Sequence, residues 1–130
     1  MTGHKAIAAV LKREGVEYLF CFPHNPLIDA VSELGIKPIV GRTERTIINM
    51  ADGYSRGSRG KKIGVVAVQY GPGAENAFGG IAQAAADSVP IIVLTGGYAA
   101  HRNGITPLFD AMEHYRGITK WAAQITGIQT

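Results

Sequence analysis

Apolar residues recur along the chain with two alternating spacings, and glycine or proline stands at most of the boundaries between them. Short, nearly continuous apolar runs predict strands that are buried on both faces. Longer segments with apolar residues three and four positions apart predict helices. The predicted strands are Tyr18–Phe22, Pro38–Val40, Ile63–Val68 and Pro90–Thr95. The predicted helices are His4–Glu14, Pro26–Leu34 with Asn25 as its cap, a helix that starts near Thr43, Ala74–Ala86, Leu108–Tyr115 and a last apolar segment at Ile118–Ile125.

Strands that alternate with helices predict an α/β protein, a three-layer α/β/α sandwich with a parallel sheet. The 130 residues suit a single domain over 1–130. Right-handed crossovers place the turns that follow the strands at one edge of such a sheet. These turns are Pro23–Asn25, Gly41–Glu44 and Gln69–Asn76, and they are where ligands bind in open α/β sheets.

The turn before the third helix carries an acidic residue. The hydroxyl of Thr43 can accept a backbone N–H of the first helical turn, which makes Glu44 the first helical residue. A carboxylate there can complement the helix dipole and do nothing more. It can also face a ligand at the sheet edge, and this stretch alone leaves both interpretations open. The apolar stripe predicted for this helix is Ile47, Ile48, Met50, Ala51 and Tyr54.

The glycine-rich turn Gly71-Pro72-Gly73 allows three interpretations. It can let a ligand approach the backbone closely, with Asn76 supplying a donor and an acceptor. It can bind a phosphate group at a helix start, or it can be only a tight structural turn. The phosphate fingerprints are incomplete, because no Gly-Lys-Ser or Gly-Lys-Thr follows and Asn76 occupies the last position of GxGxxG. The following helix, rich in Ala and Gly, indicates close packing against other backbone.

Composition and charge narrow the function classes. The formal net charge is only +3, and the basic cluster Arg56–Lys62 contains no aromatic residue, which argues against nucleic-acid binding. Cys21, the single cysteine, excludes an internal disulfide and lies in an apolar run that predicts a buried thiol. The chain begins without a charged-then-apolar leader and has no apolar run of about 20 residues, so we expect no membrane association and a cytoplasmic protein.

Several motifs occur in an order that resembles a known family. They are Phe20-x-x-Pro23, Arg42-x-Glu44, Met50-Ala51-Asp52-Gly53-Tyr54-Ser55-Arg56, Gly71-Pro72-Gly73-Ala74-x-Asn76, Asp87-Ser88-x-Pro90 and Ile118-Thr119-Lys120-Trp121. Together they resemble the N-terminal, pyrimidine-binding domain of thiamine diphosphate-dependent enzymes. The acetolactate synthases are the most similar subgroup, and benzoylformate decarboxylase and other 2-oxoacid decarboxylases are near it. The resemblance runs from about His4 to Ala123.

The resemblance implies roles for individual residues. In the family, the glutamate at the position of Glu44 bonds N1′ of the cofactor's aminopyrimidine ring. This bond favours the imino tautomer, whose 4′-nitrogen removes the proton from C2 of the thiazolium ring. By analogy Gly71, Gly73 and Asn76 line the pyrimidine pocket, and Pro23 shapes its opposite wall.

The chain also departs from the family pattern. His24 and Asn25 replace a glycine pair of the acetolactate synthases and are candidates to face the substrate. His24 can serve as an acid or base, or it can be a plain surface histidine. Gln69 stands where some decarboxylases have a catalytic histidine, and Thr43 replaces the family histidine between Arg and Glu. Thr106-Pro107-Leu108 replaces Phe-Gln-Glu, which weakens an assignment to acetolactate synthesis itself.

The resemblance implies the pyrimidine-side half of an enzyme, with lyase or transferase chemistry, that decarboxylates and can carboligate 2-oxoacids. In the family, a separate domain with a Gly-Asp-Gly motif holds the diphosphate and Mg²⁺, and no metal ligand is expected in this chain. The chain is then a fragment, or one subunit of a two-chain enzyme. Its partner is the diphosphate-binding domain of a second subunit in a homodimer or homotetramer. Two alternatives stay open: a non-catalytic regulatory or assembly module, and a nucleotide-binding α/β domain.

Overall fold

The computed structural model describes residues 1–102 and 104–127, and in them helices and strands alternate. The strands are β1 (Tyr18–Phe22), β2 (Lys37–Val40), β3 (Gly64–Val68) and β4 (Ile91–Thr95). The helices are α1 (Gly3–Arg13), α2 (Asn25–Glu33), α3 (Glu44–Gly57), α4 (Pro72–Ala86), α5 (Ala111–Arg116) and the short 3-10 helix η1 (Ala100–Arg102).

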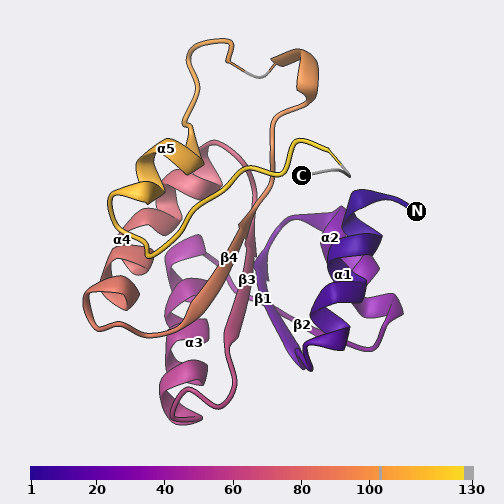
Figure 1. Ribbon diagram of the computed structural model, residues 1–130, viewed down its shortest axis with the longest axis vertical. Coiled ribbons are helices and arrows are strands. Elements are labelled where there is room, and N and C mark those ends of the chain that lie inside the picture. Colours follow the sequence, from indigo (N-terminus) through magenta and orange to yellow (C-terminus); the bar gives the residue numbers. More distant parts are fainter. Residues whose placement is uncertain (103, 128–130) are drawn as a thin grey trace.

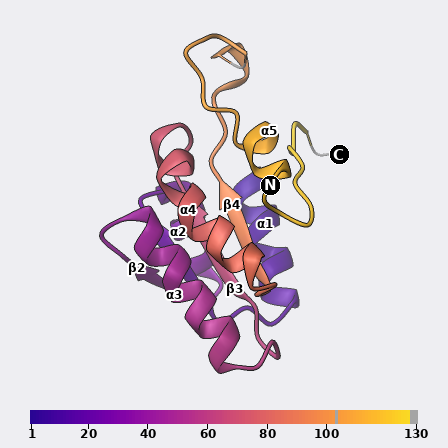
Figure 2. The ribbon, with the colours of Figure 1, turned by 90° about the vertical axis from the view of Figure 1, so that its left-hand side faces the viewer.

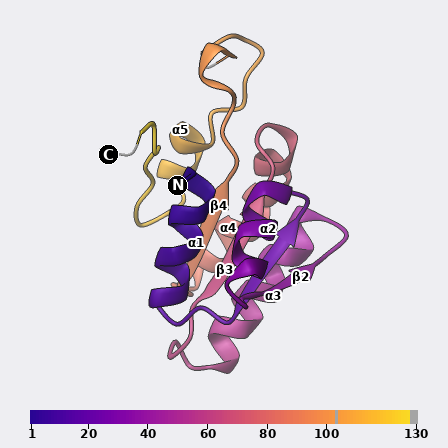
Figure 3. The same ribbon diagram turned by 90° about the vertical axis from the view of Figure 1, so that its right-hand side faces the viewer.

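The four strands of the described chain form one parallel sheet in the order β2-β1-β3-β4. Helices cover both faces, as Figure 1 shows, with α3 and α4 on one side and α1 and α2 on the other. Figure 2 looks onto the α3 and α4 side, and Figure 3 looks onto the α1 and α2 side. The three-layer α/β/α fold predicted from the sequence is therefore confirmed.

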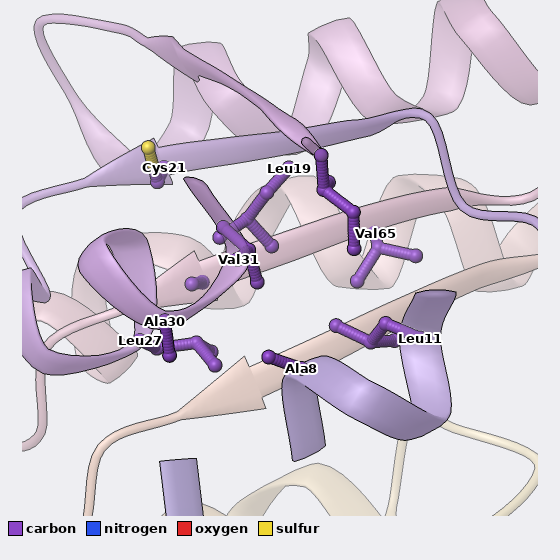
Figure 4. Close-up of a cluster of buried hydrophobic side chains, with 10 residues drawn as sticks. Ala8, Leu11, Leu19, Cys21, Leu27, Ala30, Val31 and Val65 are labelled. Carbon is purple, nitrogen blue, oxygen red and sulfur yellow. The ribbon is translucent and has the colours of Figure 1, made fainter. Parts of the chain in front are cut away.

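Alternate residues of the strands belong to two separate hydrophobic clusters, one on each face of the sheet. Leu19 and Val65 point to the α1 and α2 side, where they meet Ala8, Leu27 and Val31 (Figure 4). On the other face lies the second cluster: Phe20, Ile47, Ile48, Ala51, Val66, Val68, Ala74, Ala77, Ile81 and Tyr115. Cys21 is fully buried in the first cluster, as predicted, and burial raises the pKa of its thiol.

Helix α3 begins as the sequence predicts. The Thr43 side chain accepts the backbone N–H of Thr46 at 3.2 Å, and Glu44 is the first helical residue. Ile47, Ile48 and Ala51 are fully buried, but the prediction that Met50 faces the core is wrong, because its side chain is 40% exposed.

Other element boundaries differ from the predicted ones. Asn25 was predicted to cap the second helix, but it is the first residue of α2, and His24 is the N-cap without a side-chain hydrogen bond. Helix α4 begins at Pro72, two residues before the predicted start. The apolar segment Ile118–Ile125 forms neither helix nor strand; Ile118 and Ala122 still pack against the second cluster.

Polar groups bond the C-terminal half of α3 to the sheet. Ser55 donates to the Pro90 carbonyl at 2.7 Å and accepts the Gly64 N–H at 2.8 Å, so one buried hydroxyl joins α3, β3 and the start of β4. Arg56, the first residue of the basic cluster, is also part of this network. It lies in α3, bonds the buried Asp52 carboxylate and reaches Asp87 at 2.6 Å.

Candidate functional site

The strand order brings the three predicted turns together. Strand β1 lies between β2 and β3, and all of these strands run parallel, so the turns that follow them are neighbours at one edge. From β1 the chain crosses one face to β2, and from β3 it crosses the other face to β4. Such a reversal between neighbouring strands opens a crevice at their carboxyl ends.

Glu44 is the buried acid at this edge. Only 8% of the residue is exposed, although it stands at the first position of a helix. The side-chain amide of Asn76 donates a hydrogen bond to its Oε2 at 3.5 Å. Its Oε1 lies 3.4 Å from the position that a Cβ on Gly73 would occupy. The turn after β2 and the first turns of α4 thus meet at a single carboxylate.

Glycines leave the backbone bare on the α4 side of this carboxylate. A Cβ on Gly73 would lie within 3.1 Å of the Gln69 Cβ as well as against Glu44. Gly71 has φ +61°, a left-handed conformation that favours glycine, and a Cβ there would lie 2.7 Å from the Tyr98 hydroxyl. A side chain at Gly73 would fill the space beside the Glu44 carboxyl group, so the bare backbone there fits a flat ring that bonds this group.

The other predicted site residues divide into two groups. Gln69 lies beside Gly73 and therefore beside Glu44. Pro23, in the turn after β1, and Asn25, the first residue of α2, are both exposed. The His24 ring makes its contacts elsewhere: its Cε1 would lie 3.0 Å from a Cβ on Gly96, and its centroid is 5.4 Å from that of the His4 ring.

The His24 side chain is half-buried and lies beside a second histidine, His4. Burial, and then the neighbouring His4, lower the pKa of His24 from its ordinary value of 6.5. The neutral ring is thereby favoured near pH 7. His24 packs against the residue that follows β4 and against α1, so the structure gives it a packing contact and leaves its predicted substrate-facing role without a contact to Glu44.

Two features of the site were not predicted from the sequence. The Tyr98 hydroxyl lies over Gly71, and the Tyr98 ring packs on that of Tyr70 with centroids 4.6 Å apart. Gly80 lies directly against Ile48 where α3 and α4 cross. The excess of glycine and alanine in the α4 segment was the available signal for such close contact, but it named no partner.

The described residues lack two further features. They contain no cluster of three or more His, Cys, Asp or Glu side chains suited to a metal ion. No helix in residues 1–102 and 104–127 is both long enough and apolar enough to span a bilayer.

The sequence was compared with known protein families and curated proteins. A family profile described as the N-terminal TPP binding domain of thiamine pyrophosphate enzymes matches residues 1–123, nearly the whole chain. The chain belongs to the thiamine pyrophosphate enzyme family. Membership agrees with the parallel sheet flanked by helices.

Curated members of the thiamine pyrophosphate enzyme family share substantial identity with this chain. The acetolactate synthase large subunit of Lactococcus lactis is 43% identical over 99 residues, 73% of this chain and 17% of the relative. That of Haemophilus influenzae is 39% identical over 100 residues, 74% of this chain and 17% of the relative. The probable large subunit of Methanocaldococcus jannaschii is 37% identical over 130 residues, 96% of this chain and 22% of the relative. The match thus spans about a fifth of the relatives' length.

Proposed function

We propose that this chain is the pyrimidine-side half of a thiamine diphosphate-dependent enzyme that decarboxylates 2-oxoacids, with or without carboligation. The observation that supports this most is the Glu44 carboxyl group, buried at a sheet edge and facing the bare backbone of Gly73. Bound thiamine diphosphate would supply an electron sink for the carbon chemistry. The chain's own contribution is to bind and orient the aminopyrimidine ring.

Glu44 would hold a proton between its carboxyl group and N1′ of the ring. Its low exposure excludes water that would otherwise compete for that hydrogen bond. The bare backbone at Gly71 and Gly73 would receive the flat ring, and Gln69 would stand beside it on the substrate side. Pro23 would close the opposite wall, with His24 and Asn25 following it at the start of α2.

Substrate, diphosphate and metal would meet this chain in the complete enzyme. Relatives about five times longer, named as acetolactate synthase large subunits, support a 2-oxoacid as the substrate. We propose that a diphosphate-binding domain outside this chain holds the diphosphate and Mg²⁺, and that a second subunit supplies it in a homodimer or homotetramer. A cytoplasmic location stays a prediction from the sequence.

The proposal is tested with Glu44→Gln in the holoenzyme that contains this chain. Glutamine keeps the size of the side chain but cannot share a proton as an acid. Exchange of the cofactor's C2 proton with deuterium, followed by NMR after acid quench, should slow by about 100-fold or more. The far-ultraviolet circular dichroism spectrum should stay unchanged. An exchange rate within twofold of the wild type would overturn the role proposed for Glu44.

A further inference from the structure

We propose that Asn76 is a positioning residue that acts through Glu44, and that the close crossing of α3 and α4 puts it within reach. This inference rests on the proposed function, because it concerns the same carboxyl group. It assigns the Asn76 amide to the protein's own acid, whereas the family resemblance had placed Asn76 among the residues that line the cofactor.

The two helices cross closely because small residues of α4 face α3. A Cβ on Gly80 would lie 2.8 Å from Cγ2 and 2.9 Å from Cβ of Ile48. A Cβ on Gly79 would lie 3.0 Å from the guanidinium of Arg45. The contacts of Gly80 are shorter than a Cβ tolerates, so a larger residue there would force Ile48 or the helices to shift, whereas the long Arg45 side chain could move away from Gly79. The contact between Gly80 and Ile48 therefore limits how far apart the first turn of α3 and the first turn of α4 lie.

The close crossing of α3 and α4 places two residues of α4 beside the acid, the side chain of Asn76 and the bare backbone of Gly73. Asn76 bonds Oε2 of Glu44, while Oε1 faces Gly73. The carboxyl group is thus held at one oxygen by Asn76, and its other oxygen faces the glycine. A glutamate has several rotatable bonds, and a hydrogen bond from a neighbouring helix removes part of that freedom before a ligand binds. The oxygen that faces the glycine is the one left to bond N1′.

Asn76 is suited to substitution because it is exposed and lies within a helix. Alanine has a higher helix propensity than asparagine, so Asn76→Ala should keep the fold. Glutamine at this position keeps an amide donor on a longer arm. Gln83→Ala, an exposed position on the same helix, is the matched control.

The first measurement separates positioning from cofactor binding. In the holoenzyme, Asn76→Ala should slow C2 proton exchange by about tenfold, while the dissociation constant for thiamine diphosphate stays within about threefold. Asn76→Gln should recover part of the rate, and Gln83→Ala should match the wild type in both readouts. A large rise in the dissociation constant with an unchanged exchange rate of the bound cofactor would mean that Asn76 binds the cofactor directly, and would overturn the inference.

The second measurement is a double-mutant cycle with Glu44→Gln. If Asn76 acts through Glu44, the double variant should exchange the C2 proton no more slowly than Glu44→Gln alone. Effects that multiply would contradict the inference, because they would mean that Asn76 acts on the cofactor independently. The same cycle distinguishes the two proposals. If Glu44→Gln leaves the rate of C2 proton exchange unchanged, the proposed function is wrong. If Glu44→Gln slows the exchange but Asn76→Ala does not, only the role of Asn76 is wrong.

Discussion

The two faces of the sheet are held together in different ways. On the α1 and α2 side, apolar side chains such as Leu19, Leu27 and Val31 fill the space between helices and strands (Figure 4). On the α3 and α4 side, glycines let backbone and side chains meet at short distances. All the buried polar or charged residues found among the described residues, namely Glu44, Asp52 and Ser55, lie on α3.

This difference shows where the fold supports chemistry. A buried carboxyl group or hydroxyl is costly unless it has partners. Both ends of α3 have them: the Asn76 amide of α4 bonds Glu44, and the backbone of Gly64 and Pro90 bonds Ser55. The apolar face only has to be filled. We therefore expect substitutions on the two faces to affect stability similarly but the site differently.

The largest loss of stability is expected for Gly64→Ala. A Cβ at this position would lie 2.3 Å from the Ala51 carbonyl oxygen and 2.7 Å from the Ala51 Cα, and backbone atoms of α3 cannot move aside as a side chain can. We expect the free energy of unfolding to fall by about 4 kcal/mol, at the upper end for overpacking. Urea denaturation measures this, and a loss below about 1 kcal/mol would show that α3 can shift away from the sheet.

A smaller loss, of about 3 kcal/mol, is expected for Leu19→Ala on the opposite face. Leu19 is fully buried in the first cluster, so truncation removes apolar contacts and leaves a cavity. Because this face does not touch Glu44, the folded holoenzyme should exchange the C2 proton within twofold of the wild-type rate. Slower C2 proton exchange in fully folded Leu19→Ala protein would show that the apolar face does affect the site.

The smallest effect is the pH dependence that His24 contributes on the α1 and α2 side. Its pKa is lowered in the folded protein from 6.5, so the unfolded chain binds the proton more readily. Stability from this group is complete above about pH 6.5 and declines as the pH falls toward the folded-state pKa. His24→Gln should reduce the difference between urea midpoints at pH 7.5 and pH 5.5. An unchanged difference would mean that other groups cause the pH dependence.

Local signals in the sequence were enough for much of the fold. Thr43 as a cap and Glu44 at the first helical position follow from a few adjacent residues, and both are confirmed. The prediction that Met50 faces the core was wrong because this residue lies at the edge of the apolar stripe centred on Ile47, Ile48 and Ala51. Periodicity does not resolve where such a stripe ends. The prediction of Asn25 as the cap of α2 was wrong because proline fits the second helical position, where Pro26 lies, as well as the first.

The site was harder to predict because its contacts join distant segments. Glu44 and Asn76 are separated by 32 positions, and their contact depends on how closely Gly80 lets α4 approach Ile48. The sequence indicated that three turns share an edge but not that β1 lies between β2 and β3. That order depends on tertiary packing and is established by the structure.

A crystal structure of the holoenzyme with thiamine diphosphate bound tests the central claim most directly. The measurement is the distance from the carboxyl oxygens of Glu44 to N1′ of the aminopyrimidine ring. The account predicts that Oε1 lies about 2.6–3.0 Å from N1′, with the ring against Gly73 and the Asn76 amide still on Oε2. A ring bound elsewhere, or an N1′ that bonds a different group while Glu44 stays buried and unengaged, would contradict it.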